Sequence, residues 1–261
     1  MFALNHKEEA FDLRNAIYLA KLSGLAYYKA DYIATQLPEN TLLWSFEEPS
    51  DTTGHSTEVF VAGDAETLII VFRGTETNSS ADWVNNLDNR LYPQFLGHVH
   101  QGFWEALQQV WALLLAKINL FQDQQQRIWL AGHSQGGALA MLAARSLIEA
   151  NIPVQGVYTY GQPKVGDMLF ASNYNTVLEE NTFRIYNAED KVIQHPTKLY
   201  HAGTGVKLEI NGTFQIESGF NLLETSSGGL ANLLDSLFDY ATDNHQAHRV
   251  EAYLERLEKS Y

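Results

Sequence analysis

The sequence predicts an α/β fold in which a mostly parallel central sheet carries helices on both faces. β-prone and helical segments alternate through the middle of the chain, and this alternation is typical of parallel sheets covered by helices. One apolar, β-prone run, residues 127–131, leads into the glycine-flanked Ser134 and then directly into small helix-forming residues. With 261 residues, no internal repeat and no linker-like tract, the chain is expected to form one domain over residues 1–261.

The individual elements follow from the spacing of apolar residues. Helical spacing predicts helices at residues 8–28, 102–118, 230–240 and 250–257, and a further helix directly after Ser134. Short β-prone runs predict strands at residues 58–62, 67–72, 127–131, 154–160, 182–187, 206–210 and 213–216. The first helix is expected to bury Phe11, Leu13, Ile17, Ala20 and Leu25, and the second Phe103, Leu107, Val110, Leu114 and Ile118.

Composition excludes several classes of partner and of chemistry. The net charge is −14, from 31 acidic and 17 basic residues, so nucleic acid and strongly anionic membranes would be repelled and a neutral substrate fits better. The chain contains no cysteine, which removes disulfides, thiolate metal sites and cysteine nucleophiles. The sequence therefore predicts no nucleic-acid partner, and it leaves the oligomeric state open.

The N-terminal region does not have the pattern of a secretory signal peptide. Glu8, Glu9, Asp12 and Arg14 interrupt the stretch where the apolar part of such a signal would lie. The longest apolar run, residues 110–116, is too short to cross a bilayer. We expect a soluble chain, either cytoplasmic or exported by a route that uses no cleaved N-terminal signal.

Ser134 lies in a Gly-x-Ser-x-Gly sequence between a predicted strand and a predicted helix. This order is that of a nucleophile elbow, a sharp turn that presents a serine at the edge of a sheet. Gly132 and Gly136 fit such a turn, because a Cβ beside the serine would collide with the strand or the helix. The following helix directs its positive end to the place where an oxyanion would form. An ordinary tight turn is the alternative, but the flanking strand and helix favour the elbow.

A serine nucleophile needs a base, and the base needs a carboxylate to orient it. In proteins with such an elbow the acid follows the serine along the chain, and the histidine follows the acid. Asp190 comes just after the strand predicted at residues 182–187, which places it at the carboxyl edge where active sites of open α/β sheets form. The neighbouring Glu189 could take the same role, but Asp190 is preferred. Asp167 is interpreted as a loop or helix-capping residue.

Four histidines follow Ser134 and are candidates for the base: His195, His201, His245 and His248. His195 lies only five residues after the acid, too near to reach back easily, and His201 opens a β-prone stretch. His245 and His248 both stand just before the last predicted helix, which is the right place in the order. Spacing alone leaves these two open.

Several other side chains have both a functional and a structural interpretation. His98 and His100 could share one face of a strand as a metal pair, but no third ligand stands at a suitable spacing. Trp83, Trp104 and Phe95 are interpreted as core residues rather than ligand contacts. The helix predicted at residues 230–240 has an apolar stripe that is either a wall over an acyl site or, as we favour, a face packed on the core. That stripe consists of Leu230, Leu233, Leu234, Leu237 and Phe238.

Seven motifs then occur in a fixed order along the chain. They are VFRGT at residues 71–75, DWVNNL at 82–87, VHQGF at 99–103, GHSQGG at 132–137, YGQPKVGD at 160–167, FRIYNAEDKV at 183–192 and HRVEAYL at 248–254. With these motifs the chain resembles the class 3 (fungal-type) lipase family of α/β-hydrolases, from about residue 67 to residue 257. One such motif could arise by chance, whereas the ordered set is specific.

The resemblance implies an α/β-hydrolase fold and a catalytic triad. In the family the acid lies in the segment that matches NAEDKV, which supports Asp190 as the acid that works with Ser134. The family's histidine precedes a tyrosine–leucine pair by five residues. This matches His248, which stands five residues before the pair at residues 253–254, and does not match His245.

The resemblance also implies an oxyanion hole made by the backbone N–H groups of Gln135 and Thr75, with the Thr75 hydroxyl as a further donor held by Asn86. Three positions depart from the family's pattern. Leucine is usual where Gln135 stands, which is tolerable because the backbone N–H does the work, and proline is frequent where this chain has Ile193. Residues 76–81 are more polar than the family's lid, which argues against strong activation at an oil–water interface.

The resulting hypothesis is a serine ester hydrolase, a triacylglycerol lipase or esterase that works through an acyl-serine and needs no metal or organic cofactor. The expected substrate is a neutral lipid or another ester, with transient contact at a lipid interface. A phospholipase, a galactolipase or a feruloyl-type esterase on the same triad is the alternative among enzymes. A non-catalytic binding protein is the alternative outside them, and the intact Ser134, Asp190 and His248 weigh against it.

Overall fold

The computed structural model describes most of the chain. The described residues are 2, 4–6, 10–47, 57–75, 90–121, 126–217 and 245–261. The helix predicted at residues 230–240 with its apolar stripe, the polar segment 76–81, Trp83 and Asn86 lie outside the described residues.

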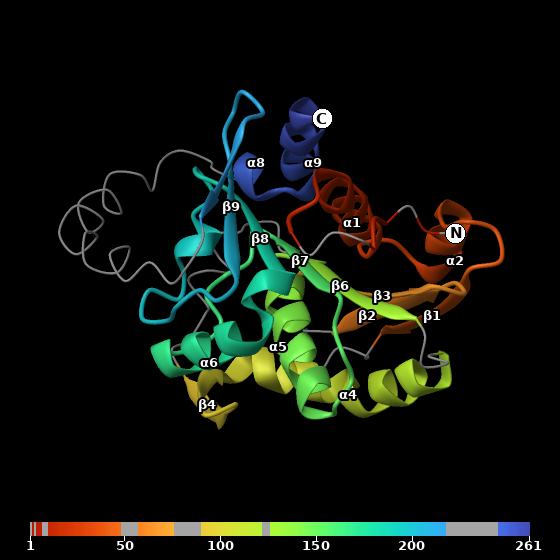
Figure 1. Cartoon of the computed structure of the whole chain (residues 1–261), viewed down its shortest axis with the longest axis horizontal. Coiled ribbons are helices and arrows are strands. Elements are labelled where there is room, and N and C mark those ends of the chain that lie inside the picture. The colour runs from red at the N-terminus through yellow and green to blue at the C-terminus, as the bar shows by residue number, and fades with distance from the viewer. Residues whose placement is uncertain are drawn as a thin grey trace.

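An eight-stranded sheet runs through the described part of the chain, in the order β1-β2-β3-β6-β7-β8-β9-β10 (Figure 1). Its strands are β1 (Leu42–Glu47), β2 (Glu58–Gly63), β3 (Thr67–Phe72), β6 (Arg127–His133), β7 (Gly156–Tyr160), β8 (Thr182–Asn187), β9 (Thr204–Leu208) and β10 (Phe214–Glu217). β3, β6, β7, β8 and β9 are parallel neighbours, whereas the pairings at the two edges are antiparallel. The mostly parallel sheet predicted from the alternation of elements is confirmed.

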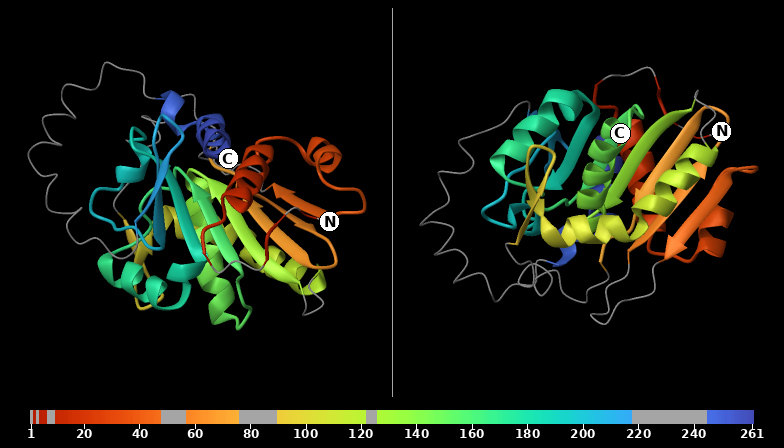
Figure 2. Two further views of the ribbon diagram at one scale, coloured as in Figure 1. Left: turned by 45° about the horizontal axis from the view of Figure 1, so that its top comes forward. Right: turned by 90° about the horizontal axis from the view of Figure 1, so that it is seen from below.

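Helices cover both faces of this sheet (Figures 1 and 2). One face carries α4 (Gln101–Phe121), α5 (Gln135–Glu149) and α6 (Met168–Leu178), and the other carries α1 (Leu13–Leu25) and α9 (Val250–Ser260). The short helices are α2 (Ala30–Gln36), α8 (His245–His248), η1 (Glu179–Asn181) and η2 (Val192–Gln194). α1 and α9 come from opposite ends of the sequence but lie side by side, and Lys21 Nζ of α1 pairs with Glu258 Oε1 of α9 at 2.8 Å.

α4 buries the face that its sequence predicts. The five apolar side chains at helical spacing are fully buried in the core between the sheet and its helices, as expected for one stripe of an amphipathic helix. They are Phe103, Leu107, Val110, Leu114 and Ile118.

α1 begins later, and buries a different face, than the sequence predicts. The carboxylate of Asp12 caps the helix by accepting hydrogen bonds from the N–H groups of Arg14 and Asn15, at 2.7 and 3.2 Å, so the helix starts at Leu13 rather than at residue 8. Of the side chains predicted to be buried, only Ala20 is so, and the others are half-buried. Small residues on the buried face let α1 approach the sheet closely enough for the Tyr160 hydroxyl to donate to the Ala16 carbonyl at 2.5 Å.

For several elements the sequence predicted no bounds. They are α2, α6, β1 and the separate antiparallel hairpin of β4 (Leu91–Gln94) and β5 (Gly97–His100). Among the described segments, no helix is both long enough and apolar enough to span a membrane.

Candidate active site

Ser134 stands at the junction between β6 and α5, where the chain turns sharply. Its φ of 56° and ψ of −128° lie in a region that non-glycine residues rarely adopt, and such strain is typical of functional turns. The Ser134 N–H donates to the carbonyl of Tyr160 at the end of the neighbouring β7, at 2.8 Å. The strand–turn–helix predicted around this serine is therefore present.

The two glycines beside Ser134 make the turn sterically feasible. A Cβ on Gly132 would overlap the backbone of Gly136, and a Cβ on Gly136 would overlap the carbonyl oxygen of Phe72 at the end of β3. Neither position has room for a larger residue unless a strand or the helix shifts.

The structure brings the predicted base and acid to Ser134 in one hydrogen-bonded chain. His248 Nε2 lies 2.8 Å from Ser134 Oγ, and His248 Nδ1 lies 2.7 Å from Asp190 Oδ2. A carboxylate only accepts, so Nδ1 carries the proton and Nε2 is left to accept from the serine hydroxyl. Ser134 is 5 % exposed, His248 is 9 % exposed and Asp190 is 1 % exposed, so these contacts are shielded from water.

Asp190 lies in the loop after β8 and is held from three sides. Besides His248, the Tyr253 hydroxyl of α9 donates to Asp190 Oδ2 at 2.5 Å, and the Val192 N–H donates to Oδ1 at 2.9 Å. Burial, and then the charge of Asp190, raise the pKa of the Tyr253 hydroxyl well above its usual range, so it remains a donor. Sequence reasoning used Tyr253 only as a marker for His248 and missed this contact.

Gly161, just after β7, lies against the acid–base pair. Its φ is +58°, and a Cβ there would stand 2.8 Å from Asp190 Oδ2, 3.0 Å from His248 Nδ1 and 3.0 Å from the Tyr253 hydroxyl. Both its backbone conformation and the close approach require glycine. Gly161 belongs to the YGQPKVGD motif, but its role was not recognised from the sequence.

The two residues expected to form the oxyanion hole lie close together. Gln135 is the first residue of α5, where the helix dipole favours negative charge. Thr75 follows β3, and its hydroxyl donates to Gln135 Oε1. The Gln135 side chain thus contacts the Thr75 hydroxyl, whereas Asn86, the partner expected for that hydroxyl, lies outside the described residues.

The other candidates for acid and base have different partners. Glu189 Oε2 accepts from Arg256 Nη1 at 2.9 Å, and Asp167 caps α6 by accepting from the Phe170 N–H at 2.8 Å, as one interpretation of its sequence position expected. His201 is half-buried and its Nε2 donates to a backbone carbonyl, that of Ile193, at 2.7 Å.

The remaining histidines lie elsewhere. His195 directly follows η2, and burial and then the charge of Lys164 lower its pKa. His245 begins α8, three residues before His248. The structure thus brings His248, and not His195 or His201, to Ser134 and Asp190.

His98 and His100 are engaged in separate contacts rather than in a metal pair. His98 Nδ1 lies 2.9 Å from Asp167 Oδ2, and His100 Nδ1 accepts from the Phe103 N–H at 3.3 Å. Within the described residues no three His, Asp or Glu side chains are placed to hold a metal ion. Phe95 and Trp104 pack against each other with ring centroids 5.5 Å apart and contribute to the core, which confirms their structural interpretation.

The sheet and the serine turn define the class of protein. A mostly parallel sheet covered by helices on both faces, with Ser134 on a strained strand-to-helix turn, is an α/β-hydrolase fold. Residues 69–200 match the sequence profile of the lipase (class 3) family. The chain belongs to this family, as the resemblance of its motifs implied.

Known proteins with similar sequence or structure agree with this assignment. The lipase of Rhizomucor miehei is 33% identical over 186 residues, which are 66% of this chain and 50% of that lipase. Phospholipase A1-IIalpha of Arabidopsis thaliana is 31% identical over 117 residues, 41% of this chain and 27% of that protein. The crystal structure of a fungal lipase superposes with a TM-score of 0.73 at 20% identity, over 95% of this chain and 98% of the other, and shows the shared fold. The chain spans half or less of the length of the curated relatives it matches.

Proposed function

We propose that this protein is a serine ester hydrolase of the lipase and esterase type, with Ser134 as nucleophile, His248 as general base and acid, and Asp190 as the residue that orients His248. One observation carries the proposal: Ser134 Oγ, the His248 ring and the Asp190 carboxylate form a buried chain of hydrogen bonds of 2.8 and 2.7 Å. A carboxylate that fixes the imidazole tautomer, and an imidazole that takes the serine proton, are the parts that acyl transfer needs.

In the first half of the proposed reaction Ser134 Oγ forms a bond with the ester carbonyl carbon while its proton passes to His248 Nε2. Asp190 stabilises the imidazolium that results. The carbonyl oxygen becomes an oxyanion, for which the N–H groups of Thr75 and Gln135 are the proposed donors. Each donor of this kind contributes about 3 kcal/mol to the stability of the transition state.

Departure of the alcohol completes the first half, and the second half repeats the same proton transfers with water. His248 protonates the leaving alcohol as its bond to the carbonyl carbon breaks, which leaves an acyl group on Ser134. Water then attacks the acyl carbon and gives its proton to His248, and the acid is released as Ser134 regains its hydroxyl proton. No step requires a metal or an organic cofactor.

The proposed substrate class is that of neutral acyl esters, acylglycerols above all. The net charge of −14 would repel strongly anionic lipid surfaces, and a relative named as a lipase supports a lipid ester. We propose that contact with a lipid interface is transient. A phospholipase is the second candidate, because a relative named as a phospholipase A1 is 31% identical over the part that aligns. We also propose that residues 1–261 form one domain, since the two apolar clusters, one on each face, pack on the same sheet.

Hydrolysis of p-nitrophenyl esters from acetate to palmitate, by the native protein and by Ser134→Ala, tests the proposal. We expect activity in the native protein and its loss by a factor of at least about 10³ in the Ser134→Ala variant. A preference for long acyl chains and turnover of emulsified triacylglycerol would indicate a lipase, whereas activity limited to short soluble chains would indicate an esterase. No activity on any chain length, or activity that survives Ser134→Ala, would contradict the mechanism and favour a binding protein.

A further inference from the structure

His133, the residue before the proposed nucleophile, contacts the main chain of the proposed base. It is 5 % exposed, and its Nε2 lies 2.5 Å from the backbone carbonyl oxygen of His248. Its Nδ1 lies 2.8 Å from the hydroxyl of Tyr27, just after α1. The His133 and His248 rings are also in contact, with centroids 4.7 Å apart. One buried imidazole therefore joins β6, α8 and the end of α1.

These partners determine which nitrogen of His133 carries the proton. A backbone carbonyl can only accept, so Nε2 must donate, and the Tyr27 hydroxyl then donates to the unprotonated Nδ1. Burial, and secondarily the charge of protonated His248, lower the pKa of His133 to about 3, although its contact with the His248 carbonyl and the charge of Asp190 act the other way. His133 therefore stays neutral, with the same tautomer, when His248 takes up the serine proton.

The element that carries His248 needs such an anchor. α8 has only four residues, too few for a helix to be stable by itself. Its main chain is instead held by side chains from the sheet: Asn187 Nδ2 of β8 donates to the Ala247 carbonyl at 2.7 Å, and His133 Nε2 donates to the next carbonyl. The carbonyls of Ala247 and His248 are thus both fixed, and His248 is the residue whose ring must reach Ser134.

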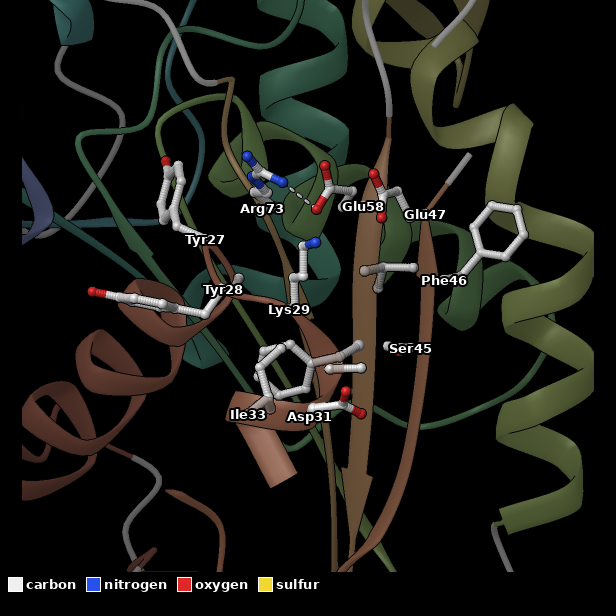
Figure 3. A pocket seen from close by; sticks show the side chains of 14 residues that line it. Tyr27, Tyr28, Lys29, Asp31, Ile33, Ser45, Phe46, Glu47, Glu58 and Arg73 are labelled. Carbon is white, nitrogen blue, oxygen red and sulfur yellow. Dashed lines mark ion pairs between the residues drawn. The ribbon is translucent and has the colours of Figure 1, made fainter. Parts of the chain in front are cut away.

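Tyr27 is itself fixed on both sides. The Arg73 guanidinium lies over its ring, 5.6 Å from the centroid, and Arg73 pairs with Glu58. Figure 3 shows Tyr27, Arg73 and Glu58 at one end of a pocket of about 550 Å³. A Cβ on Gly74 would overlap the Tyr27 hydroxyl and lie 2.6 Å from the His133 carbonyl oxygen, so this network also touches the residue before Thr75.

We propose that His133 is a positioning residue that holds His248 in line with Ser134 through the His248 carbonyl, and that the Tyr27 hydroxyl keeps His133 in the tautomer that can do so. The inference rests on the proposed function for its kinetic consequence, but the hydrogen-bond arrangement can be tested without catalysis. His133 does not touch the reacting atoms in this scheme and acts through His248 alone.

Three substitutions distinguish the effect of the hydrogen bonds from the effect of side-chain volume. His133→Gln places an amide N–H near the position of Nε2, His133→Leu fills similar space without a donor, and Tyr27→Phe keeps the ring under Arg73 but removes the hydroxyl. On a short soluble ester we expect kcat to fall on the order of 100-fold in His133→Leu with little change in KM, because the base is misplaced while the substrate site is unaltered. His133→Gln should recover much of this loss, and Tyr27→Phe should lower kcat about tenfold, as for one hydrogen bond.

A proton NMR spectrum provides the second readout. The hydrogen bond from His248 Nδ1–H to Asp190 should give a low-field resonance, assigned by its loss in His248→Gln. We expect this resonance to be present in the native protein and in His133→Gln, and to be lost or broadened in His133→Leu. The ¹⁵N shifts of His133 should report the Nε2–H tautomer in the native protein and a mixture of tautomers in Tyr27→Phe.

The outcomes distinguish this inference from the proposed function. An inactive native protein that still shows the low-field resonance and its loss in His133→Leu would contradict the function but support the positioning. Native activity that depends on Ser134, together with unchanged kcat and an unchanged resonance in His133→Leu, would contradict the positioning alone. If His133→Leu does not fold, the other two variants still test the positioning. A fall in kcat on the order of 100-fold in a folded His133→Gln, together with an unchanged kcat in Tyr27→Phe, would also contradict the positioning.

Discussion

At the scale of single residues, two unusual backbone conformations meet at the proposed site. Ser134, with φ 56°, and Gly161, with φ +58°, follow the adjacent parallel strands β6 and β7. The first presents a hydroxyl to His248, and the second lacks the Cβ that would otherwise stand about 3 Å from the acid–base pair. Strain at one position and the absence of a side chain at the other therefore serve the same geometry.

Replacing Gly161 by alanine tests the second of these conformations. The new methyl group would lie 2.8 Å from Asp190 Oδ2 and would force the His248–Asp190 pair apart, so we expect kcat/KM to fall on the order of 100-fold. The positive φ adds a stability cost of about 1 kcal/mol. Ester hydrolysis and urea unfolding measure the two effects.

Gly203→Ala is the matched control for that substitution. Gly203 also has a positive φ, of +79°, and a Cβ there would meet Thr182 rather than the site residues. This variant should lose stability and keep its kcat. Unchanged kcat/KM in Gly161→Ala, or an equal fall in Gly203→Ala, would show that the contact with the acid–base pair is unimportant.

The sequence could predict some of the site residues but not the further contacts that hold them in place. The Gly-x-Ser-x-Gly sequence led to Ser134, and order along the chain with the end of a predicted strand led to Asp190, while the choice of His248 over His245 needed the family resemblance. His133 and Tyr253 were not recognised, because they contact residues 115 and 63 positions away, and no local pattern encodes such contacts. The structure places the predicted residues together, and their catalytic roles stay predictions.

At the scale of elements, burial decides which segments can be predicted. α4 shows five apolar residues at helical spacing because one stripe of it faces the core, and this helix was predicted nearly to its ends. α2 buries only Ile33, and β1 is an edge strand with no buried residue, so neither has a periodic pattern to detect. For α1 the start depends on the Asp12 cap, which apolar spacing does not reveal.

Two neighbouring leucines in α4 test this argument directly. Leu114 is fully buried, whereas Leu113 is 49 % exposed. Leu114→Ala should lower the free energy of unfolding by about 2–5 kcal/mol, through lost burial and the cavity that remains. Leu113→Ala should change it by about 0.5 kcal/mol or less. Urea denaturation of both variants measures the difference, and similar values for the two would mean that α4 does not pack as described.

At the scale of the whole molecule, the sheet topology explains why distant residues converge. Ser134 follows β6, Gly161 follows β7 and Asp190 follows β8, and these three strands are parallel neighbours. Their carboxyl ends lie at one edge of the sheet, which is where the alternation of strands and helices predicted an active site. The helix α9, packed on the sheet beside α1, supplies Tyr253 from the far end of the chain.

The overall charge affects which surfaces and substrates can approach this edge of the sheet. With a net charge of −14, the protein would be repelled by anionic surfaces at low ionic strength. The proposed neutral ester substrate is consistent with this charge. The predicted lid segment, residues 76–81, lies outside the described residues, and the expectation of weak interfacial activation stays a prediction.

Covalent labelling of Ser134 tests the central claim most directly. A p-nitrophenyl alkylphosphonate should bond to Ser134 Oγ and release one equivalent of nitrophenolate, and peptide mass spectrometry should locate the adduct on Ser134. The Ser134→Ala variant should not react, and His248→Gln should react far more slowly because the serine proton has no acceptor. No adduct in the native protein, or an adduct on another residue that persists in Ser134→Ala, would contradict the account.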